Sequence, residues 1–259
     1  MGSTPNSTFT NNTAQLQGGA IEGVAEGPTV IVTNSTFAGN SCRDSFGGAI
    51  FNPYHGKLKV TNSTFVNNSA FGGGAIMNWD NGDWARLAVT NSTFSGNIAT
   101  GWWGGAAVST SDVRPMVKNS ILANSTGGNC SGAMPLINYI IDSDGTCGGG
   151  PATDPMLDPL GLADHGGPTQ TIAVQPGSPA INIAPRRTKT DQRGYIRPGA
   201  GAARCTIGAY EFNSPGCPAR LTACGEMNIC SNLKKDPNNC GACGNVCGVA
   251  QKCVGGMCK

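Results

Sequence analysis

The chain has 259 residues, of which 12% are charged and 39 are glycine, and its formal net charge is +2. This near-neutral charge gives no electrostatic case for binding nucleic acid or an anionic membrane, and no apolar run reaches the roughly eighteen residues of a membrane span. Helix formers such as Glu, Lys and Leu are scarce whereas Thr, Val, Ile and turn residues dominate, so we expect strands and turns almost throughout.

A four-residue block returns along the chain at almost constant spacing. Asn-Ser-Thr-Phe begins at residues 6, 34, 62 and 91, and Asn-Ser-Ile-Leu begins at residue 119, so the interval is 28 or 29 residues. A second block, Gly-Gly-Ala-Ile, begins at residues 18, 47 and 73, and Gly-Gly-Ala-Ala begins at residue 104. Self-similarity at this period indicates stacked repeats, and the variable distance between the two blocks indicates surface loops of adjustable length.

Each repeat has the pattern of one turn of a β-helix. In residues 58–65, apolar or small residues alternate with polar ones on both sides of Asn62, a residue type that tolerates the left-handed conformation of a corner. With a third strand through Gly-Gly-Ala-Ile, each repeat would make three short strands that pair with the next coil at roughly 4.8 Å. We therefore predict an all-β fold, a right-handed single-stranded parallel β-helix with about five or six visible coils.

Residues one period apart should then lie above one another in columns. We expect an interior aromatic stack of Phe9, Phe37, Phe65 and Phe94, continued by Leu122. We expect an amide ladder of Asn12, Asn40, Asn68 and Asn97.

An outward column could in principle match an ice lattice. It consists of Thr8, Thr36, Thr64 and Thr93. The next outward column lacks this regularity, since it has Thr10, Ala38, Val66 and Ser95. Ice binding is therefore a minor hypothesis. The Asn-x-Ser/Thr triplets at Asn6, Asn34, Asn62 and Asn91 are interpreted as turn chemistry rather than glycan acceptors.

Function on a solenoid is expected in loops that project from its corners. One side should carry the segments before the Gly-Gly blocks, residues 41–46, 69–71 and 98–103. The other side should carry the segments after them, residues 22–27, 52–55, 78–84 and 109–114. All four tryptophans fall in these loops. Stacked rings form a platform for sugars, whose C–H faces pack on π-systems, although rings that merely pack under their own loops are an equal alternative. The candidate carbohydrate-binding residues are Tyr54, Trp79, Trp84, Trp102 and Trp103.

Carboxylates in the same loops suggest two kinds of catalysis. Asp80 and Asp83 could act with Asp112 or Glu26 as acid and base on a glycosidic bond, as in a glycoside hydrolase.

A carboxylate cluster could instead bind calcium and activate a uronate proton for a polysaccharide lyase, with Arg114 or His55 assisting. The candidate catalytic residues are Asp80, Asp83, Asp112 and Arg114. A triad mechanism has little support, because no motif places His55 or His165 beside a nucleophile.

Several motifs resemble known families. The Gly-Gly-Ala-Ile and Phe-x-x-Asn pair is similar to the repeats of right-handed parallel β-helix proteins, including bacterial polymorphic outer-membrane proteins. Residues 154–160, 164–169, 176–181, 190–194 and 205–211 resemble the closing region of β-helix proteins called choice-of-anchor Q, with His165 where Asn is expected. This resemblance implies export, surface attachment and a bridge between Cys130 and Cys147, but no single activity.

The tail is rich in cysteine and resembles small modules of secreted bacterial and plant stigma-specific proteins. It contains Cys217, Cys224, Cys230, Cys240, Cys243, Cys247, Cys253 and Cys258. The spacing of Cys240 and Cys243 suits zinc, but the tail has no histidine and an exported chain favours disulfides, so we expect disulfides and no metal. Their connectivity stays open, and Cys42 and Cys205 are expected to be buried thiols.

These patterns predict three parts: coils in residues 1–150, a closing region in residues 151–214 and a disulfide module in residues 215–259. We expect a secreted or surface-attached monomer that binds an extracellular polysaccharide and cleaves it if the carboxylates are catalytic. The alternative is a non-catalytic surface adhesin or structural protein.

Overall fold

The computed structural model describes residues 2–259 except residues 26, 28, 80–85, 112–114, 133, 135, 149, 187, 215, 218–220 and 225–228. Every named element of this described part is a β-strand. The part contains no helix that is long and apolar enough to cross a bilayer.

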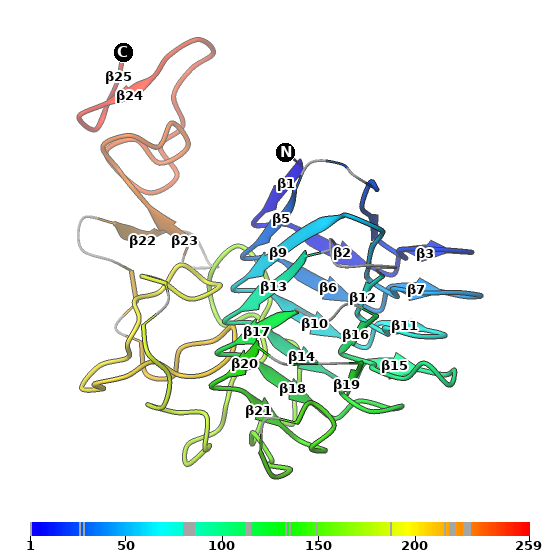
Figure 1. The fold of residues 1–259 in the computed structure, drawn as a ribbon. Helices are drawn as coiled ribbons and strands as arrows, with labels where there is room; N and C mark the ends of the chain where they lie inside the picture. Colours follow the sequence, from blue (N-terminus) through cyan, green and yellow to red (C-terminus); the bar gives the residue numbers. More distant parts are fainter. Residues whose placement is uncertain are drawn as a thin grey trace.

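Short strands from successive repeats stack into four parallel sheets (Figure 1). The first sheet contains β1 (Gly2–Pro5), β5 (Val30–Thr33), β9 (Lys57–Thr61), β13 (Arg86–Thr90), β17 (Met116–Lys118) and β20 (Leu136–Asn138). The second contains β2 (Thr8–Thr10), β6 (Thr36–Ala38), β10 (Thr64–Val66), β14 (Thr93–Ser95), β18 (Ile121–Ala123) and β21 (Ile141–Asp142). The third contains β3 (Thr13–Ala14), β7 (Ser41–Cys42), β11 (Ser69–Ala70) and β15 (Ile98–Ala99). The fourth contains β4 (Ile21–Glu22), β8 (Ile50–Asn52), β12 (Ile76–Asn78), β16 (Val108–Thr110) and β19 (Cys130–Ser131).

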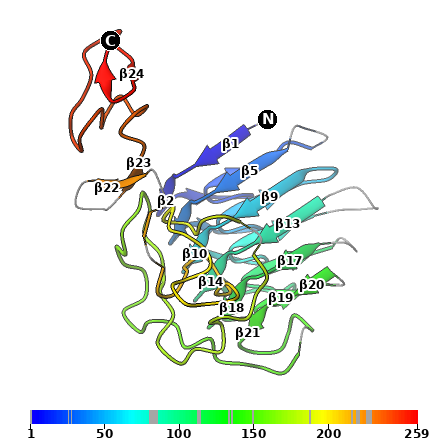
Figure 2. The same cartoon turned by 90° about the vertical axis from the view of Figure 1, so that its left-hand side faces the viewer.

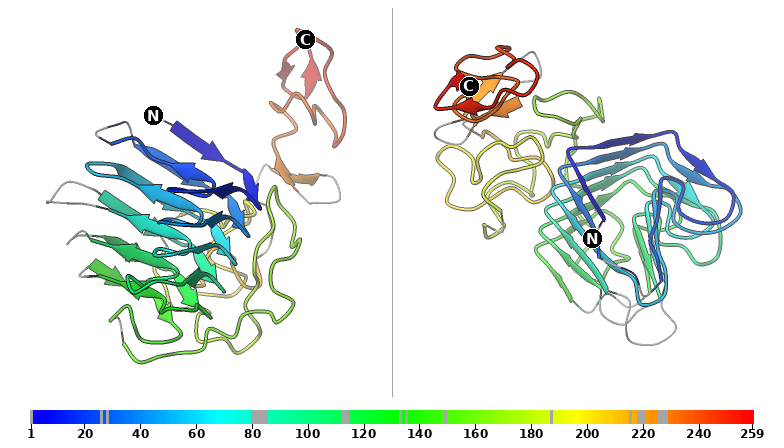
Figure 3. Two further views of the ribbon diagram at one scale, coloured as in Figure 1. Left: turned by 90° about the vertical axis from the view of Figure 1, so that its right-hand side faces the viewer. Right: turned by 90° about the horizontal axis from the view of Figure 1, so that it is seen from above.

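The chain is thus a parallel β-solenoid, and the predicted fold class is confirmed. Its first four turns each carry all four strands, and two further turns carry three and two of them. The sequence predicted three strands a turn. The additional strand has two residues, too short to show the alternation by which strands are recognised in a sequence. Figure 2 shows the first sheet face-on, and Figure 3 shows the winding from above.

The predicted interior columns are confirmed. Consecutive rings of Phe9, Phe37, Phe65 and Phe94 stack with centroids 4.6, 4.7 and 4.7 Å apart and almost parallel planes. Beside them, Nδ2 of each ladder Asn donates to Oδ1 of the next at 2.8, 2.9 and 3.0 Å, from Asn12 to Asn97. Asn40, Asn68 and Asn97 are fully buried, so each of these amides is satisfied by its neighbours where water has no access.

Asparagine and glycine make the corners, as predicted. The first Asn of each repeated block has a φ between 49° and 52°, which places it in the left-handed region. The second glycine of the Gly-Gly block is required for a different reason, because neighbouring coils approach each other closely there. A Cβ on Gly48 would overlap the carbonyl oxygen of Gly74 in the next coil, so only glycine fits there.

The region 151–214 lies against the outer face of the second sheet, where it buries the outward threonines (Figure 1, yellow). Thr36 donates to the carbonyl of Gln170 at 2.6 Å, Thr64 donates to Oε1 of Gln192 at 2.7 Å, and Thr93 accepts from the amide of Ala209 at 3.0 Å. The ice-binding hypothesis is therefore wrong, because three of its four threonines are covered by protein rather than exposed to solvent.

The corner asparagines also contact this region. Nδ2 of Asn62 donates to the carbonyl of Thr190 at 3.0 Å, and Nδ2 of Asn91 donates to Oγ1 of Thr188 at 2.8 Å. Both asparagines are buried in the folded protein. At Asn62 and Asn91 this supports the interpretation of the triplets as turns rather than glycan acceptors.

Two ion pairs organise the region from within. Arg193 pairs with Asp191 at 2.6 Å, and Arg197 pairs with Glu211 at 2.8 Å, with all four side chains buried. The guanidinium of Arg193 also lies 3.8 Å from the centroid of the Tyr210 ring. Buried charges are tolerated only when they are paired and hydrogen-bonded, so these residues are a structural network.

Candidate functional site

The outer face of the fourth sheet is covered by loops of its own coils. Because side chains alternate along a strand, Ile50 and Ile76 point into the solenoid while Phe51 and Met77 point out. Phe51 and Met77 are nevertheless buried. Phe51 lines a groove together with the rings of Phe46, Tyr54 and Trp79, which come from loops that flank the short strands.

These rings form one connected cluster, which we call the aromatic band. Trp79 is at its centre, with its ring centroid 5.1 Å from that of Phe46 and 5.2 Å from that of Trp103. Tyr54 extends the band on one side at 6.4 Å from Trp79, and Trp102 extends it on the other at 5.0 Å from Trp103. Phe71 completes the six rings, 6.2 Å from Phe46 and 6.3 Å from Trp102.

The band is partly core and partly surface. Phe46, Phe71, Trp79 and Trp103 are half-buried, whereas Trp102 is 82% exposed and Tyr54 is 38% exposed. The inner rings therefore stabilise the loops, as the alternative interpretation proposed, and the outer rings face solvent. The band offers a surface whose shape is held by its own packing.

A groove of about 630 Å³ adjoins the band over the first two coils. Phe46, Tyr54 and Trp79 line one part of it, and Glu22, Gly23, Val24 and Ala25 line the other. Gln17, Ser45, Phe51 and Pro53 complete its lining. The hollow lies where the first coil has Gln17 beside Phe46 of the second coil, and Gly23, Val24 and Ala25 near Tyr54 and Trp79 of later coils.

The two sets of loops meet instead of lying on opposite sides, so that prediction is wrong. Phe46 and Trp103 precede the Gly-Gly blocks and Tyr54 and Trp79 follow them, yet their rings touch. The reason is the length of the strand between the two sets. The fourth-sheet strands have two or three residues, roughly 7 to 10 Å, which aromatic side chains from both ends can bridge.

The candidate residues divide into two groups. Tyr54, Trp79, Trp102 and Trp103 are brought together in the band. Trp84 and all four candidate catalytic residues, Asp80, Asp83, Asp112 and Arg114, lie outside the described residues, as does Glu26. No geometry for catalysis or for calcium binding follows for them.

Sequence reasoning missed Phe46 and Phe71 as members of the cluster. Both precede a Gly-Gly block, as Trp102 and Trp103 do, so position within the repeat was an available signal. His55 has a φ of 56° and is exposed beside Tyr54. Its conformation indicates a tight turn after the fourth-sheet strand.

Most of the cysteines form disulfides rather than thiolate groups. The structure joins Cys130 to Cys147, and in the tail it joins Cys224 to Cys243, Cys240 to Cys253 and Cys247 to Cys258. Cys217 is also disulfide-bonded. The tail strands β22 (Thr222–Cys224) and β23 (Ile229–Ser231) form one antiparallel pair, and β24 (Cys253–Val254) and β25 (Met257–Cys258) form another. The bridges tie β22, β24 and β25 to the segment 240–247.

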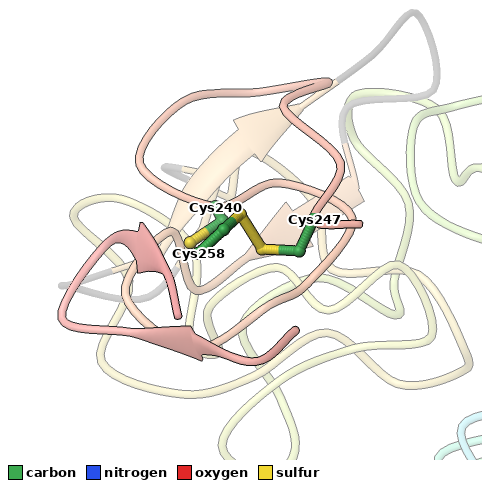
Figure 4. A group of neighbouring side chains, drawn as sticks. All are labelled: Cys240, Cys247 and Cys258. Carbon is green, nitrogen blue, oxygen red and sulfur yellow. A yellow bond between two sulfur atoms is a disulfide. The ribbon is translucent and has the colours of Figure 1, made fainter. Parts of the chain in front are cut away.

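Three tail sulfurs, those of Cys240, Cys247 and Cys258, lie within 4.8 Å of one another (Figure 4). Each belongs to a disulfide, so none is the thiolate that zinc requires. Cys42 and Cys205 are free and buried, and burial raises the pKa of each thiol. Neither therefore has the properties of a reactive nucleophile.

Comparison with known proteins agrees with the β-solenoid fold. Residues 6–23 and 34–53, within the first two coils, match the Chlamydia polymorphic membrane protein repeat. Together with the stacked parallel sheets, this identifies the architecture. The chain is a β-helix repeat protein. No curated protein and no solved structure matches it significantly.

Proposed function

We propose that this β-helix protein binds an extracellular polysaccharide through the aromatic band and its groove. The observation that carries the proposal is the continuity of the rings, which run from Tyr54 through Trp79 and Trp103 to Trp102. Rings at successive positions along a surface match the successive sugars of a chain molecule, whose C–H faces pack on π-systems. Polar groups of Gln17, Glu22 and Ser45 line the groove for the hydroxyls.

The surface location in this proposal rests on two observations. The repeat similarity is to a family described as Chlamydia polymorphic membrane proteins. Disulfides in the tail indicate folding in an oxidising compartment. We infer a secreted or surface-attached protein, acting as a monomer, which sedimentation velocity would test.

Binding is tested with a panel of plant and microbial polysaccharides immobilised in native affinity gels. Trp102→Ala removes an exposed ring and should weaken retention about tenfold, since one stacking contact contributes roughly 1–3 kcal/mol in nucleic-acid complexes of similar design. Leu160→Ala is the matched control, because Leu160 is 85% exposed and lies in the closing region. Equal retention of the two variants would contradict the proposal.

Cleavage is a separate question within the same assay. We propose that Asp80, Asp83 and Asp112, assisted by Arg114 and with calcium in the lyase version, act on the chain bound by the band. Released reducing ends would indicate a hydrolase, and unsaturated ends would indicate a lyase. If Asp80→Asn and Asp83→Asn retained polysaccharide with unchanged affinity and the wild type released no ends, the protein would be a non-catalytic adhesin.

A further inference from the structure

We propose that the cysteine-rich tail docks on an anionic lipid surface through one face of its last hairpin. This inference goes beyond the proposed function and does not depend on it. The charged residues of the tail, residues 215–259, are Arg220, Lys234, Lys235, Lys252, Lys259, Glu226 and Asp236. Their charges sum to +3, so the remaining residues, in a chain whose total is +2, carry −1. The net charge of the whole chain conceals this concentration of positive charge.

Disulfides fix which face of the hairpin is exposed. Cys253 lies opposite Cys258, and both are bonded to the segment 240–247. Val254 and Met257 also lie opposite each other, and because side chains alternate along a strand they project from the other face. Their side chains are 52% and 59% exposed. The hairpin therefore presents an aliphatic pair to solvent while its cysteines hold it from behind.

Two lysines flank this aliphatic pair. The backbone amide of Lys252 donates to the carbonyl of Lys259 at 2.8 Å, and the amide of Lys259 donates back at 2.9 Å. Both lysines are exposed. Alternation places them on the same face as Val254 and Met257, so two like charges lie opposite each other. Such a pair is destabilising by itself, and a bound anion relieves the repulsion.

A groove of about 600 Å³ adjoins this face. Lys252 and Val254 line it from the hairpin, and Lys234 and Lys235 line it from the turn after β23. Pro237 adds a further apolar wall, and the described residues that line the groove include no acid. The groove therefore brings three positive charges together around an apolar floor.

The lysines of the tail have no carboxylate partner among the described residues. The ion pairs of that part of the chain lie in the closing region and involve arginine. Asp236, which follows Lys235, accepts from the amide of Asn238 and from Nδ2 of Asn239, both at 2.9 Å. Its carboxylate is thus held within its own turn. The lysines remain available to an external anion.

Lysines around aliphatic side chains favour a lipid surface over a polysaccharide. Residues 215–259 contain no Phe, Tyr or Trp, so the tail lacks the ring faces on which sugars stack. Val254 and Met257 instead suit the boundary between headgroups and acyl chains, where lysines attract phosphates. The strands β24 and β25 lie at the end of the tail that is away from the solenoid (Figures 1 and 3), so a membrane reaches them without meeting the coils.

The test is vesicle co-sedimentation of the whole protein with its disulfides intact. The probes are vesicles of phosphatidylcholine alone, and vesicles in which part of this lipid is replaced by anionic phosphatidylglycerol. At low salt we expect about tenfold or more tighter binding to the anionic vesicles, and we expect high salt to remove most of the difference. Equal binding to the two kinds of vesicle, or binding to neither, would overturn the inference.

Variants assign the binding to the hairpin. Lys252→Gln should weaken binding about fivefold, which is the contribution of one lysine near an anionic surface. Lys59→Gln is the matched control, because Lys59 is an exposed lysine on β9 of the solenoid. Met257→Gln keeps the charge and length of the side chain, and should weaken binding about three- to tenfold through the loss of apolar contact. Its matched control is Leu160→Gln, since Leu160 is 85% exposed and lies in the closing region.

The remaining outcomes separate the lipid surface from other partners. If each tail variant bound like its control, or if Trp102→Ala alone abolished vesicle binding, the tail would not be the docking surface. If Met257→Gln had no effect and dextran sulfate bound as tightly as the anionic vesicles, the lysines would recognise polyanions rather than lipid, and the inference would be wrong. None of these results bears on sugar binding by the aromatic band, so the two proposals fail independently.

Discussion

Replacement of Gln192 should separate the closing region from the solenoid. Its side chain is fully buried between them. Nε2 donates to Oγ1 of Thr36 at 2.8 Å, to Oγ1 of Thr169 at 2.9 Å and to the carbonyl of Gln170 at 3.1 Å, while Oε1 accepts from Thr64 at 2.7 Å. Leucine at this position would keep most of the volume and remove every one of these hydrogen bonds.

The magnitude follows from this geometry. Nε2 has two hydrogens for its three acceptors, so the amide makes about three net hydrogen bonds, each contributing roughly 1 kcal/mol. The buried Thr64 hydroxyl also loses its acceptor, which costs about 1–2 kcal/mol more. We therefore expect Gln192→Leu to lower the free energy of unfolding by about 4–5 kcal/mol. Addition of Thr64→Val, which removes the orphaned hydroxyl, should restore about 1 kcal/mol.

The assay is urea unfolding with the disulfides intact, followed by far-ultraviolet circular dichroism, together with limited proteolysis of residues 151–214. Gln170→Leu is the control, because the Gln170 side chain is exposed and its backbone carbonyl makes the contact. It should change stability by no more than about 0.5 kcal/mol. If Gln192→Leu matched this control, the closing region would not be held by the threonine column.

Three further results are expected from the columns and the closing region. The Asn68 amide accepts a hydrogen bond from Asn40 in the coil before and donates one to Asn97 in the coil after. Asn68→Ala should therefore lower the free energy of unfolding, measured by chemical denaturation, by about 2–4 kcal/mol. Unchanged stability of this variant would refute the ladder as a source of stability. Gly96→Ala should cost about 1–3 kcal/mol, because Gly96 has a φ of +65° and a new Cβ would lie 2.5 Å from Oδ1 of Asn67. Part of that loss of stability should be recovered when Asn67→Gly is added to Gly96→Ala. Strictly additive effects of the two substitutions in a double-mutant cycle would contradict the proposed clash between the new Cβ and Asn67. Burial lowers the pKa of His165, so the unfolded chain binds the proton more tightly. Stability should therefore decline as pH falls below about 6.5, and His165→Asn should flatten that decline in thermal melts recorded across the window.

The winding could be predicted because its determinants are local and repeat. A ring such as Phe65 stacks on Phe37 only if the chain returns it to the same place each turn, and that demand is visible as a period. The amide ladder and the left-handed corner asparagines follow from the same argument. The sequence of one repeat therefore explains the ring stack, the amide ladder and the corners of every coil.

The site could be predicted only in part. Residue type and loop position identified Tyr54, Trp79, Trp102 and Trp103, and these rings do gather. The prediction of two separate sides was wrong, because whether rings from opposite ends of a strand touch depends on strand length in ångströms. The groove beside Trp79 could not be predicted from the sequence either, since it arises where the first coil has no aromatic ring.

Periodicity settles how this chain winds, because each coil repeats the contacts of the one before and a single unit specifies them all. It does not settle which outward face is covered. The threonine column has the same pattern whether it meets water or Gln192, and only the docking of a non-repeating segment buries it. Contacts between segments 128 or 156 residues apart leave no period in the sequence, so the division into covered and open faces is a property of the tertiary structure.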